Sequence, residues 1–327
     1  MYRSILVPLD GSLLSEYALP VACDIARRSG AALRLVHVHM RATWNPIYIE
    51  GQPVIDERMQ SLDTAHERAY LERIRDRVIA EQELNVSIAI RDPASDVGRD
   101  LTVADALAAD AAATNTDLVV MTTHGRGGLA RFWLGSVADT LVHLSSVTVL
   151  SLRPAEPVPP IDHPPVFRHI LIPLDGSALA EQILEPALAL GDLTRAMYTL
   201  LHIVEPLVLP DYALLAPTFQ LDPQLTQAAL AKGQRYLDDL AQRLRTGGRQ
   251  VHTRALLAAQ PAAEILDAAQ AQGADLIALA THGRSGLTRL LLGSVADKVR
   301  RGADMPVLLY RPQVSPTADR AADATRI

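Results

Sequence analysis

Cysteine is almost absent from this sequence, which has a single one, Cys23. One thiol cannot form a disulfide within the chain, so the sequence fits a reducing compartment. No uninterrupted apolar stretch reaches the roughly 18 residues that a membrane-spanning helix needs. Met1 is followed almost directly by the apolar residues 5–7, which leaves no room for a charged segment and a cleavable leader. We therefore expect a soluble, cytoplasmic protein with no membrane partner.

An excess of positive charge is also absent. The chain carries 31 lysines and arginines against 37 aspartates and glutamates, and its formal net charge is -6. This balance argues against a strongly basic protein, and we expect no nucleic-acid partner. Hydrophobic residues make up 49% of the 327 residues, although aromatic residues make up only 4%. The composition excludes wholesale disorder, and the length suits about two domains of roughly 150 residues each.

The sequence does contain an internal repeat. Three segments of the first copy return in the second: ILVPLDGS at 5–12 as ILIPLDGS at 170–177, THGR at 123–126 and again at 281–284, and LGSVAD at 134–139 and again at 292–297. The offset is 165 for the first segment and 158 for the other two, so the first copy has a net seven extra residues (165 − 158). We expect these extra residues around 92–103, ahead of a helix.

A proline-rich segment separates the two copies. Six prolines lie between Arg153 and Pro165, counting Pro165 itself. Such a segment is extended and semi-rigid, and its missing N–H groups exclude a central strand. It therefore marks the domain boundary. The predicted organisation is a first domain at 1–153, a linker at 154–166, a second domain at 167–312 and a tail at 313–327.

Each copy alternates apolar runs with amphipathic helical patterns. Strands are predicted near 4–9, 32–39, 86–90, 117–121 and 147–152, and again near 168–174, 196–204, 250–257, 275–280 and 306–310. Helices are predicted in the first copy near 13–29, 58–83, 103–114 and 136–144. The strands are continuous apolar runs, as expected when helices cover both faces of a sheet. The alternation predicts an α/β fold of two repeated, doubly wound Rossmann-like domains, each with a parallel sheet flanked by helices.

Polar residues and glycines stand where such a sheet binds ligands, at the carboxyl ends of its strands. Asp10 and Asp175 end the first strand of each copy and are followed directly by Gly-Ser. Each carboxylate suits hydrogen bonds with a ribose or a base. It equally suits a turn or the cap of the next helix, and the residues alone leave both interpretations open.

A second cluster follows the fourth strand of each copy. Residues 122–128 read TTHGRGG and precede a helix start at Gly135-Ser136, while residues 280–286 read ATHGRSG and precede Gly293-Ser294. Glycines let backbone N–H groups approach a ligand closely, and a helix start favours phosphate. The two serines suit hydroxyl hydrogen bonds to a phosphate oxygen. A capping box is the alternative interpretation of each serine, because both copies fit its spacing Ser-x-x-Asp. A capping serine stands at the end of the helix that favours phosphate, so the two interpretations can hold together.

The arginines of the two loops, Arg126 and Arg284, suit charge-assisted bonds to phosphate. Solvated loop charges are the alternative interpretation. The histidines inside apolar strands, His37 and His202, are expected in the core rather than as ligands. His124, in a glycine loop like its counterpart His282, suits a polar contact.

Motifs for catalysis are missing from the sequence. No G-x-x-x-x-G-K-[ST] occurs, and Lys232 and Lys298, the only lysines, follow no glycine-rich loop, which disfavours P-loop phosphoryl transfer. Neither H-E-x-x-H nor paired cysteines mark a metal site. The sequence pattern places no histidine beside a nucleophile. The sequence therefore predicts no catalytic residue and no protein-held metal.

Each copy resembles a universal stress protein domain, so the chain resembles a tandem member of that family. The ATP-binding members carry the motif G-x2-G-x9-G-[ST] after an early aspartate. Gly125, Gly135 and Ser136 have this spacing, which Gly283, Gly293 and Ser294 repeat. The first glycine of the motif is replaced by Thr122 in one copy and by Ala280 in the other, two small residues.

The resemblance implies ATP as the ligand, with magnesium bound through its phosphates. Adenine would lie at the backbone near the end of the second strand, and the phosphates would lie on the glycine loop and the helix start. The candidate residues of the first copy are Pro8, Leu9, Asp10, Val38, Met121, Thr122, Gly125, Arg126, Gly135, Ser136, Val137 and Ala138. Those of the second copy are Pro173, Leu174, Asp175, Ile203, Ala280, Gly283, Arg284, Gly293, Ser294, Val295 and Ala296.

The same resemblance implies five parallel strands per domain and an intramolecular pseudo-dimer, with further homodimerisation as an option. Family dimers associate through the fifth strand, so residues 147–152 would lie against residues 305–310. The leading hypothesis for function is a stress-response protein whose bound adenine nucleotide regulates an unidentified protein partner, with slow or no hydrolysis. A nucleotide hydrolase or nucleotidyl transferase is one alternative, and a dimerisation scaffold that binds no nucleotide is the other.

Overall fold

The computed structural model contains two compact units, Met1–Pro165 and Val166–Ile327. The described residues are 1–40, 47–49, 52–54, 57–93, 101–123, 136–144, 147–154, 159–162, 164–206, 223–281 and 293–313. The division between the units falls at the end of the proline-rich segment.

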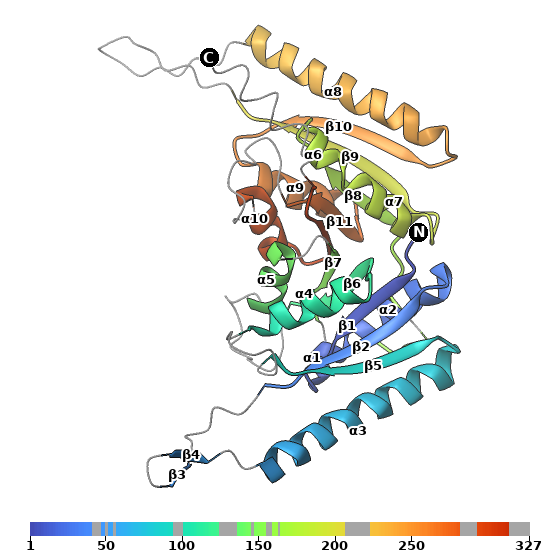
Figure 1. The fold of residues 1–327 in the computed structure, drawn as a ribbon. Helices are drawn as coiled ribbons and strands as arrows, with labels where there is room; N and C mark the ends of the chain where they lie inside the picture. Colours follow the sequence, from blue (N-terminus) through green and yellow to red (C-terminus); the bar gives the residue numbers. More distant parts are fainter. Residues whose placement is uncertain are drawn as a thin grey trace. The chain divides into compact units, whose positions relative to one another are not determined.

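The first unit contains a five-stranded parallel sheet with the order β7-β6-β1-β2-β5. Its elements in chain order are β1 (Ser4–Pro8), α1 (Leu13–Glu16), α2 (Ala18–Ser29), β2 (Ala32–Val38), β3 (Ile47–Ile49), β4 (Gln52–Val54), α3 (Glu57–Gln82), β5 (Val86–Arg91), α4 (Val103–Ala113), β6 (Leu118–Thr122), α5 (Ser136–Leu144) and β7 (Thr148–Leu152). Figure 1 shows these elements along the chain.

The second unit repeats the arrangement, with the parallel order β12-β11-β8-β9-β10. Its elements are β8 (His169–Pro173), α6 (Ala178–Glu181), α7 (Leu184–Gly191), β9 (Met197–Val204), α8 (Pro223–Arg245), β10 (Val251–Leu257), α9 (Pro261–Ala271), β11 (Leu276–Ala280), α10 (Ser294–Gly302) and β12 (Val307–Tyr310). The connection before α9 is shorter than the one before α4, which is where the extra residues of the first copy were expected.

Helices cover both faces of each sheet because successive strands are added first on one side of the first strand and then on the other. From β1 the chain runs outward through β2 to β5 and then returns to β6 and β7 on the other side of β1. Right-handed crossovers therefore place α2 and α3 on one face and α4 and α5 on the opposite face. Contacts between α2 and α3, and between α4 and α5, agree with this layering. The predicted α/β fold class is confirmed.

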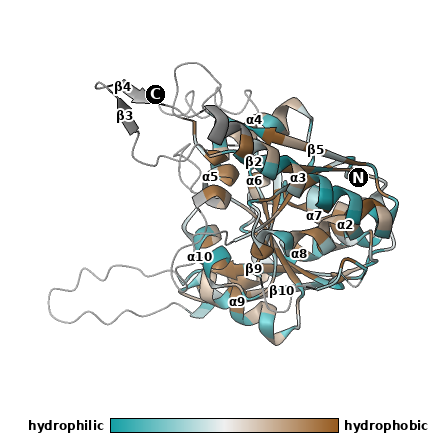
Figure 2. Ribbon diagram, turned by 90° about the horizontal axis from the view of Figure 1, so that it is seen from below, coloured by the Kyte–Doolittle hydropathy of each residue, from teal (hydrophilic) through white to brown (hydrophobic). Residues whose placement is uncertain are grey.

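The core of each unit is built from the apolar strands. The side chains of Ile5, Leu6 and Val7 in β1 are fully buried, and so are those of Ile170, Leu171 and Ile172 at the same positions of β8. Figure 2 shows the strands largely in the brown of hydrophobic residues, between helices that carry much of the teal. Burial on both faces explains why the strands are continuous apolar runs in the sequence.

One predicted helix is wrong in detail. The pattern at 13–29 predicted a single helix, but the structure has two, α1 and α2, with Tyr17 between them. Pro20 stands in the first turn of α2 and has no N–H to donate to the carbonyl of Glu16, so the ladder of helical hydrogen bonds is interrupted there. The second unit has the same break between α6 and α7, with Pro186 at the start of α7.

A short hairpin follows β2 and was not predicted from the sequence. Strands β3 and β4 pair antiparallel, with Ile47 opposite Val54. Strands of three residues are too short to show a reliable period in the sequence.

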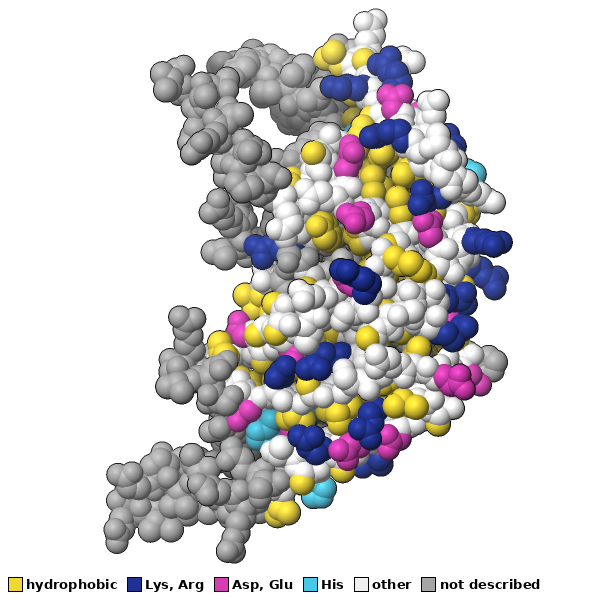
Figure 3. Space-filling view, turned by 45° about the vertical axis from the view of Figure 1, so that its right-hand side comes forward, with side chains coloured by type: hydrophobic (Ala, Val, Ile, Leu, Met, Phe, Trp, Pro, Cys, Tyr) yellow, Lys and Arg dark blue, Asp and Glu magenta, His cyan; other side chains and the backbone are white. Residues whose placement is uncertain are grey.

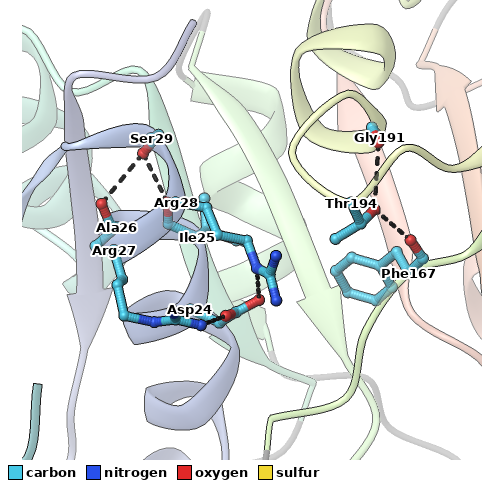
Figure 4. Close-up of polar contacts among 9 residues, drawn as sticks. All are labelled: Asp24, Ile25, Ala26, Arg27, Arg28, Ser29, Phe167, Gly191 and Thr194. Carbon is cyan, nitrogen blue, oxygen red and sulfur yellow. Dashed lines mark hydrogen bonds and ion pairs between the residues drawn. The ribbon is translucent and has the colours of Figure 1, made fainter.

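Local polar contacts secure the ends of the early helices (Figure 4). In α2 the buried carboxylate of Asp24 accepts hydrogen bonds from Arg27 at 2.5 Å and from Arg28 at 2.7 Å. In the second unit Oγ1 of Thr194 donates to the carbonyl of Phe167 at 2.5 Å and contacts the carbonyl of Gly191 at 3.2 Å. These bonds tie the chain just before β8 to the end of α7.

A buried ion cluster distinguishes the first unit from the second. The carboxylate of Asp110 in α4 accepts two hydrogen bonds from Arg34 of β2, at 2.8 and 3.0 Å, and is also paired with Arg91 of β5. The side chain of Asp110 is 0% exposed. At the corresponding positions of the second unit stand Thr199, Leu256 and Ala268. The whole cluster is therefore exchanged for uncharged residues between the two copies.

Acid is expected to remove part of the stability that this cluster provides. Burial acts to raise the pKa of Asp110, but the hydrogen bonds and charges of Arg34 and Arg91 outweigh it and lower the pKa below its usual value. A carboxyl group whose pKa is lowered by folding stabilises the protein above its unfolded-state pKa of about 4, and this contribution is lost as the pH falls through the folded-state pKa. Urea unfolding at about pH 5 and about pH 3 should show a larger loss of stability in the wild type than in a variant with Arg34→Thr, Arg91→Leu and Asp110→Ala. An equal loss in the two proteins would contradict this explanation.

Candidate functional site

The predicted site residues that belong to strands lie at the carboxyl edge of each sheet. In the first unit the strand order reverses between β1 and β6, and in the second between β8 and β11. Ligands of doubly wound sheets bind outside the strand ends at this point. Pro8, Val38 and Thr122 are the last residues of β1, β2 and β6. Pro173 and Ala280 occupy the same places in β8 and β11, and the remaining strand candidates, Leu9, Met121, Leu174 and Ile203, lie within one residue of a strand end.

The aspartate after the first strand forms the same turn in both units. Oδ1 of Asp10 accepts hydrogen bonds from the backbone N–H of Ser12 at 2.9 Å and from its hydroxyl at 2.6 Å. Asp175 accepts the same pair from Ser177, at 2.9 and 2.6 Å. The glycine between aspartate and serine has a φ of 83° in each unit, a left-handed conformation that favours glycine. The turn interpretation is therefore observed, and it holds the carboxylate at the strand end.

The serine of this turn starts the following helix. The hydroxyl of Ser12 accepts the backbone N–H of Ser15 at 3.2 Å, and that of Ser177 accepts the N–H of Ala180 at 3.1 Å. Each serine is thus the N-cap of a short helix, α1 or α6. The aspartate, the turn and the cap form one hydrogen-bonded unit that recurs in both copies.

His37 and His202 are core residues, as predicted. Both are buried, and Nδ1 of each lies 2.7 Å from the carbonyl oxygen that follows the first strand, Leu9 for His37 and Leu174 for His202. A carbonyl oxygen only accepts, so Nδ1 carries the hydrogen in both rings. The two histidines hold the strand end in place.

A tyrosine and a glutamate that were not predicted from the sequence form a hydrogen bond beside this turn in both units. The hydroxyl of Tyr70 in α3 donates to Glu16 at 3.1 Å, and that of Tyr236 in α8 donates to Glu181 at 3.0 Å. Burial, followed by the neighbouring glutamate, raises the pKa of both tyrosines, so the hydroxyls stay donors. The internal repeat could have revealed these pairs, because the two glutamates are offset by 165 residues and the two tyrosines by 166.

The helix start of the second unit lies directly against the end of β11. The N–H of Gly293 donates to the carbonyl oxygen of Thr281 at 2.8 Å. A Cβ atom at position 293 would lie 2.9 Å from that oxygen. The φ of Gly293 is −55°, which any residue adopts, so glycine is required here for space and not for conformation. Ser294 and Val295 open α10 directly after this close approach, with Ala296 buried behind them.

The alternative interpretation of Ser294 and Asp297 as a capping box is wrong. Gly293 is the N-cap of α10, and Ser294 is its first helical residue, with an exposed side chain. The carboxylate of Asp297 instead accepts hydrogen bonds from Arg300 at 3.2 Å and from Arg301 at 2.8 Å. Burial acts to raise the pKa of Asp297, but these two arginines outweigh it and lower the pKa. The hydroxyl of Ser294 is therefore not used for capping.

The remaining loop candidates lie outside the described residues. These are Gly125, Arg126, Gly135, Gly283 and Arg284, together with His124 and His282. In the first unit Ser136, Val137 and Ala138 form the first turn of α5, and the side chain of Ser136 is outside the description. Their contact with a phosphate stays a prediction.

Other kinds of site find little support within the described part of the chain. It contains no group of three or more His, Cys, Asp or Glu side chains arranged to hold a metal ion. No helix among these residues is long and apolar enough to cross a membrane. On the face shown in Figure 3, basic and acidic side chains lie interspersed among uncharged ones.

Two successive doubly wound units, each with an aspartate turn and a helix start at its carboxyl edge, define a tandem Rossmann-like α/β protein. The chain belongs to the universal stress protein family, whose model matches residues 1–153 and again residues 167–311.

Some known relatives match both units of this chain, and others match a single unit. The universal stress protein Rv2005c of Mycobacterium tuberculosis (strain H37Rv) is 28% identical over 321 residues, covering 94% of this chain and 97% of the relative. A universal stress protein of Thermus aquaticus is 34% identical over 146 residues, which are 45% of this chain and 100% of the relative. The crystal structure of a universal stress protein from Archaeoglobus fulgidus covers 94% of this chain and 96% of its own, with a TM-score of 0.63 and 17% identity, and so shares the fold.

Proposed function

We propose that each unit binds an adenine nucleotide, ATP, at the carboxyl edge of its sheet, and that the bound state regulates a protein partner in a stress response. The observation that carries the proposal is the duplicated edge. The aspartate turn has the same two hydrogen-bond distances, 2.9 and 2.6 Å, in both units, although the copies differ at many other positions. The turn keeps a carboxylate where a ribose or a base would approach the strand end.

The start of α10 suits the phosphates. A Cβ at position 293 would collide with the backbone of Thr281, so the start of α10 is bordered there by main-chain atoms and not by a side chain. The N-terminus of a helix presents unpaired N–H groups and the positive end of the helix dipole, both of which favour phosphate. The exposed hydroxyl of Ser294, which is not used in a cap, supplies a further donor. Magnesium would be held through the phosphates of the nucleotide.

Regulation is favoured over efficient catalysis because the described histidines and aspartates of this edge already have structural roles. His37 and His202 are buried against carbonyl oxygens, and Oδ1 of Asp10 and of Asp175 closes a turn. A general base has to be within hydrogen-bond reach of the proton that it abstracts. These side chains instead stabilise the edge, as expected of a binding site that changes the affinity for a partner.

Isothermal titration with ATP and magnesium tests the proposal. Two binding events per chain are expected. No heat and no thermal stabilisation at millimolar nucleotide would count against it and favour a scaffold. Turnover above background that disappears in the double variant Gly135→Val and Gly293→Val would favour a hydrolase instead.

The two serines at the helix starts are expected to contribute unequally to nucleotide binding. The adjoining loops read Arg131-Phe132-Trp133 in one unit and Arg289-Leu290-Leu291 in the other, so the surroundings of the phosphates differ. We expect Ser136→Ala and Ser294→Ala to weaken binding to different extents, the larger loss being about tenfold for one charge-assisted hydrogen bond. Titration of each variant with ATP measures the two losses, and equal losses would contradict the prediction.

A further inference from the structure

Strand β5 of the first unit has one open side. Among the described strands it pairs only with β2, and it ends the sheet. The carbonyl oxygens of Asn85 and Arg91 accept N–H groups of β2, so the odd-numbered residues of this strand bond to β2. The N–H and C=O groups of the residues between them therefore point away from the sheet. These residues are Val86, Ile88 and Ile90, and their outward groups have no partner among the described residues.

The equivalent strand of the second unit, β10, has its free side covered by side chains of α8. The guanidinium of Arg245 donates to the carbonyl of Val251 at 2.5 and 3.1 Å. Oε1 of Gln234 accepts the outward N–H of Ala255 at 3.0 Å. An exposed charge, Arg254, also stands on this strand. Covering side chains and charges are devices that prevent a further strand from pairing with a sheet edge.

Helix α3 gives β5 no such cover. At the positions of Gln234 and Arg245, offset by 166 residues, stand Arg68 and Ile79. Arg68 makes no hydrogen bond within the described part of the chain, and Ile79 is 41% exposed although it is apolar. The strand carries no charge before Arg91, which is paired with α4. An uncovered and uncharged edge that is rich in β-branched residues is a template for a further strand.

We propose that this edge binds a second copy of the chain, whose β5 pairs with it antiparallel about a two-fold axis. Ile88 then lies opposite Ile88 of the second copy, and Val86 lies opposite Ile90. All three residues direct N–H and C=O groups outward, so each opposed pair exchanges two hydrogen bonds. The side chains in these pairs are all β-branched, which stabilises a sheet. The contact is self-complementary, and it closes at two copies because β10 is covered.

The helices beside the edge fit the same two-fold axis. Helix α3 contacts both β5 and β2, along which it lies (Figure 1). Between the two copies, the α3 helices would therefore be separated by about two strand spacings, or roughly 10 Å. This is the usual distance between the axes of packed helices. Pairing of the strands thus brings the helices into contact without a change in either unit.

Charges on α3 match across this axis. In α8 the side chains at the positions of Arg68 and Glu72 both bond Thr253. Thr253 corresponds to Ile88, so Arg68 and Glu72 lie on either side of the axis. Antiparallel helices then place the arginine of each copy opposite the glutamate of the other. Neither side chain has an ion pair among the described residues, so both are available for this contact.

Analytical ultracentrifugation of the full chain tests the interface. The wild type is expected to sediment as a dimer of about 71 kDa (2 × 35.4 kDa) at about 100 µM. Arg68→Glu sets like charges against each other and is expected to weaken the dimer about tenfold. Adding Glu72→Arg to this variant restores opposite charges and should restore the dimer. Both side chains lie on the surface of α3, so these changes should leave the fold of the unit intact.

A proline at the centre of the strand tests the hydrogen bonds. Ile88→Pro removes an N–H that points outward, so no bond to β2 is lost, and the dimer should weaken at least about a hundredfold. Thr253→Pro is the matched control at the covered edge of β10 and should leave the dimer unchanged. Thermal unfolding checks that both variants fold, and the charge exchange on α3 decides the question where either does not.

Hydrogen exchange of the wild type gives a measurement without substitutions. The amides of Val86, Ile88 and Ile90 should exchange more slowly at high than at low protein concentration, while that of Thr253 should not change. A monomer at about 100 µM overturns the proposal, and so does a dimer that neither Arg68→Glu nor Ile88→Pro weakens. These measurements are made without nucleotide, so their outcome is separate from that of the proposed function.

Discussion

Replacing Asp110 by alanine is expected to lower the free energy of unfolding by about 3 kcal/mol, the usual cost of removing one partner from a buried ion pair. The carboxylate is fully buried between Arg34 and Arg91, and the side chain of Arg34 is only 19% exposed. Without Asp110 the guanidinium of Arg34 would stay away from water with its charge uncompensated. Urea unfolding near neutral pH measures the loss.

The second unit provides the control for this prediction. Introducing its residues at all three positions, Arg34→Thr, Arg91→Leu and Asp110→Ala, removes every charge of the cluster together. Replacing a whole buried ion cluster by uncharged residues is often neutral or stabilising, so the triple variant should lie within about 1 kcal/mol of the wild type. A triple variant as unstable as Asp110→Ala would show that the cluster itself, rather than the unpaired charge, determines the stability.

The strands and their order could be predicted because parallel sheets leave a strong trace in the sequence. A strand buried on both faces must be apolar at every position, as β1 is at residues 5–7, and the repeat shows the same signal twice. The carboxyl edge then follows from the rule for doubly wound sheets, which is why Asp10 and Asp175 were found before their turns were seen.

Contacts between distant residues could not be predicted in this way. Arg34 and Asp110 are 76 residues apart, and His39 and Glu67 are 28 apart, so neither pair shares a local pattern. The capping box at Ser294 failed for a similar reason. Its spacing is local, but the choice of N-cap depends on the distant backbone of Thr281, which admits only glycine at position 293.

Comparison of the two copies supplies part of the missing information. The ion-cluster residues Arg34, Arg91 and Asp110 are replaced together in the second copy, as expected for side chains in contact. The same holds for His39 and Glu67, which are both exchanged for small or apolar residues. Positions that change in concert between the halves of a tandem chain are therefore candidates for contacts that differ in role between them.

Valine at position 293 is expected to weaken ATP binding by the second unit about a hundredfold. Its Cβ would lie 2.9 Å from the carbonyl oxygen of Thr281, a backbone atom that cannot rotate away. The start of α10 must then move, which breaks the 2.8 Å bond from Gly293 to Thr281 and displaces the N–H groups of Ser294 and Val295. Losing one or two charge-assisted hydrogen bonds to phosphate, at about 1.5–3 kcal/mol each, gives this magnitude.

Titration of Gly293→Val with ATP and magnesium should show one of two binding events lost and the other retained. Gly247→Val is the matched control, because the nearest atom to its Cβ, at 2.7 Å, is the flexible Nη1 of Arg249. Both variants should keep a cooperative thermal unfolding transition. If Gly293→Val still binds two nucleotides with unchanged affinity, the phosphates do not lie on α10, and the duplicated edge has to be explained by its aspartate turn alone.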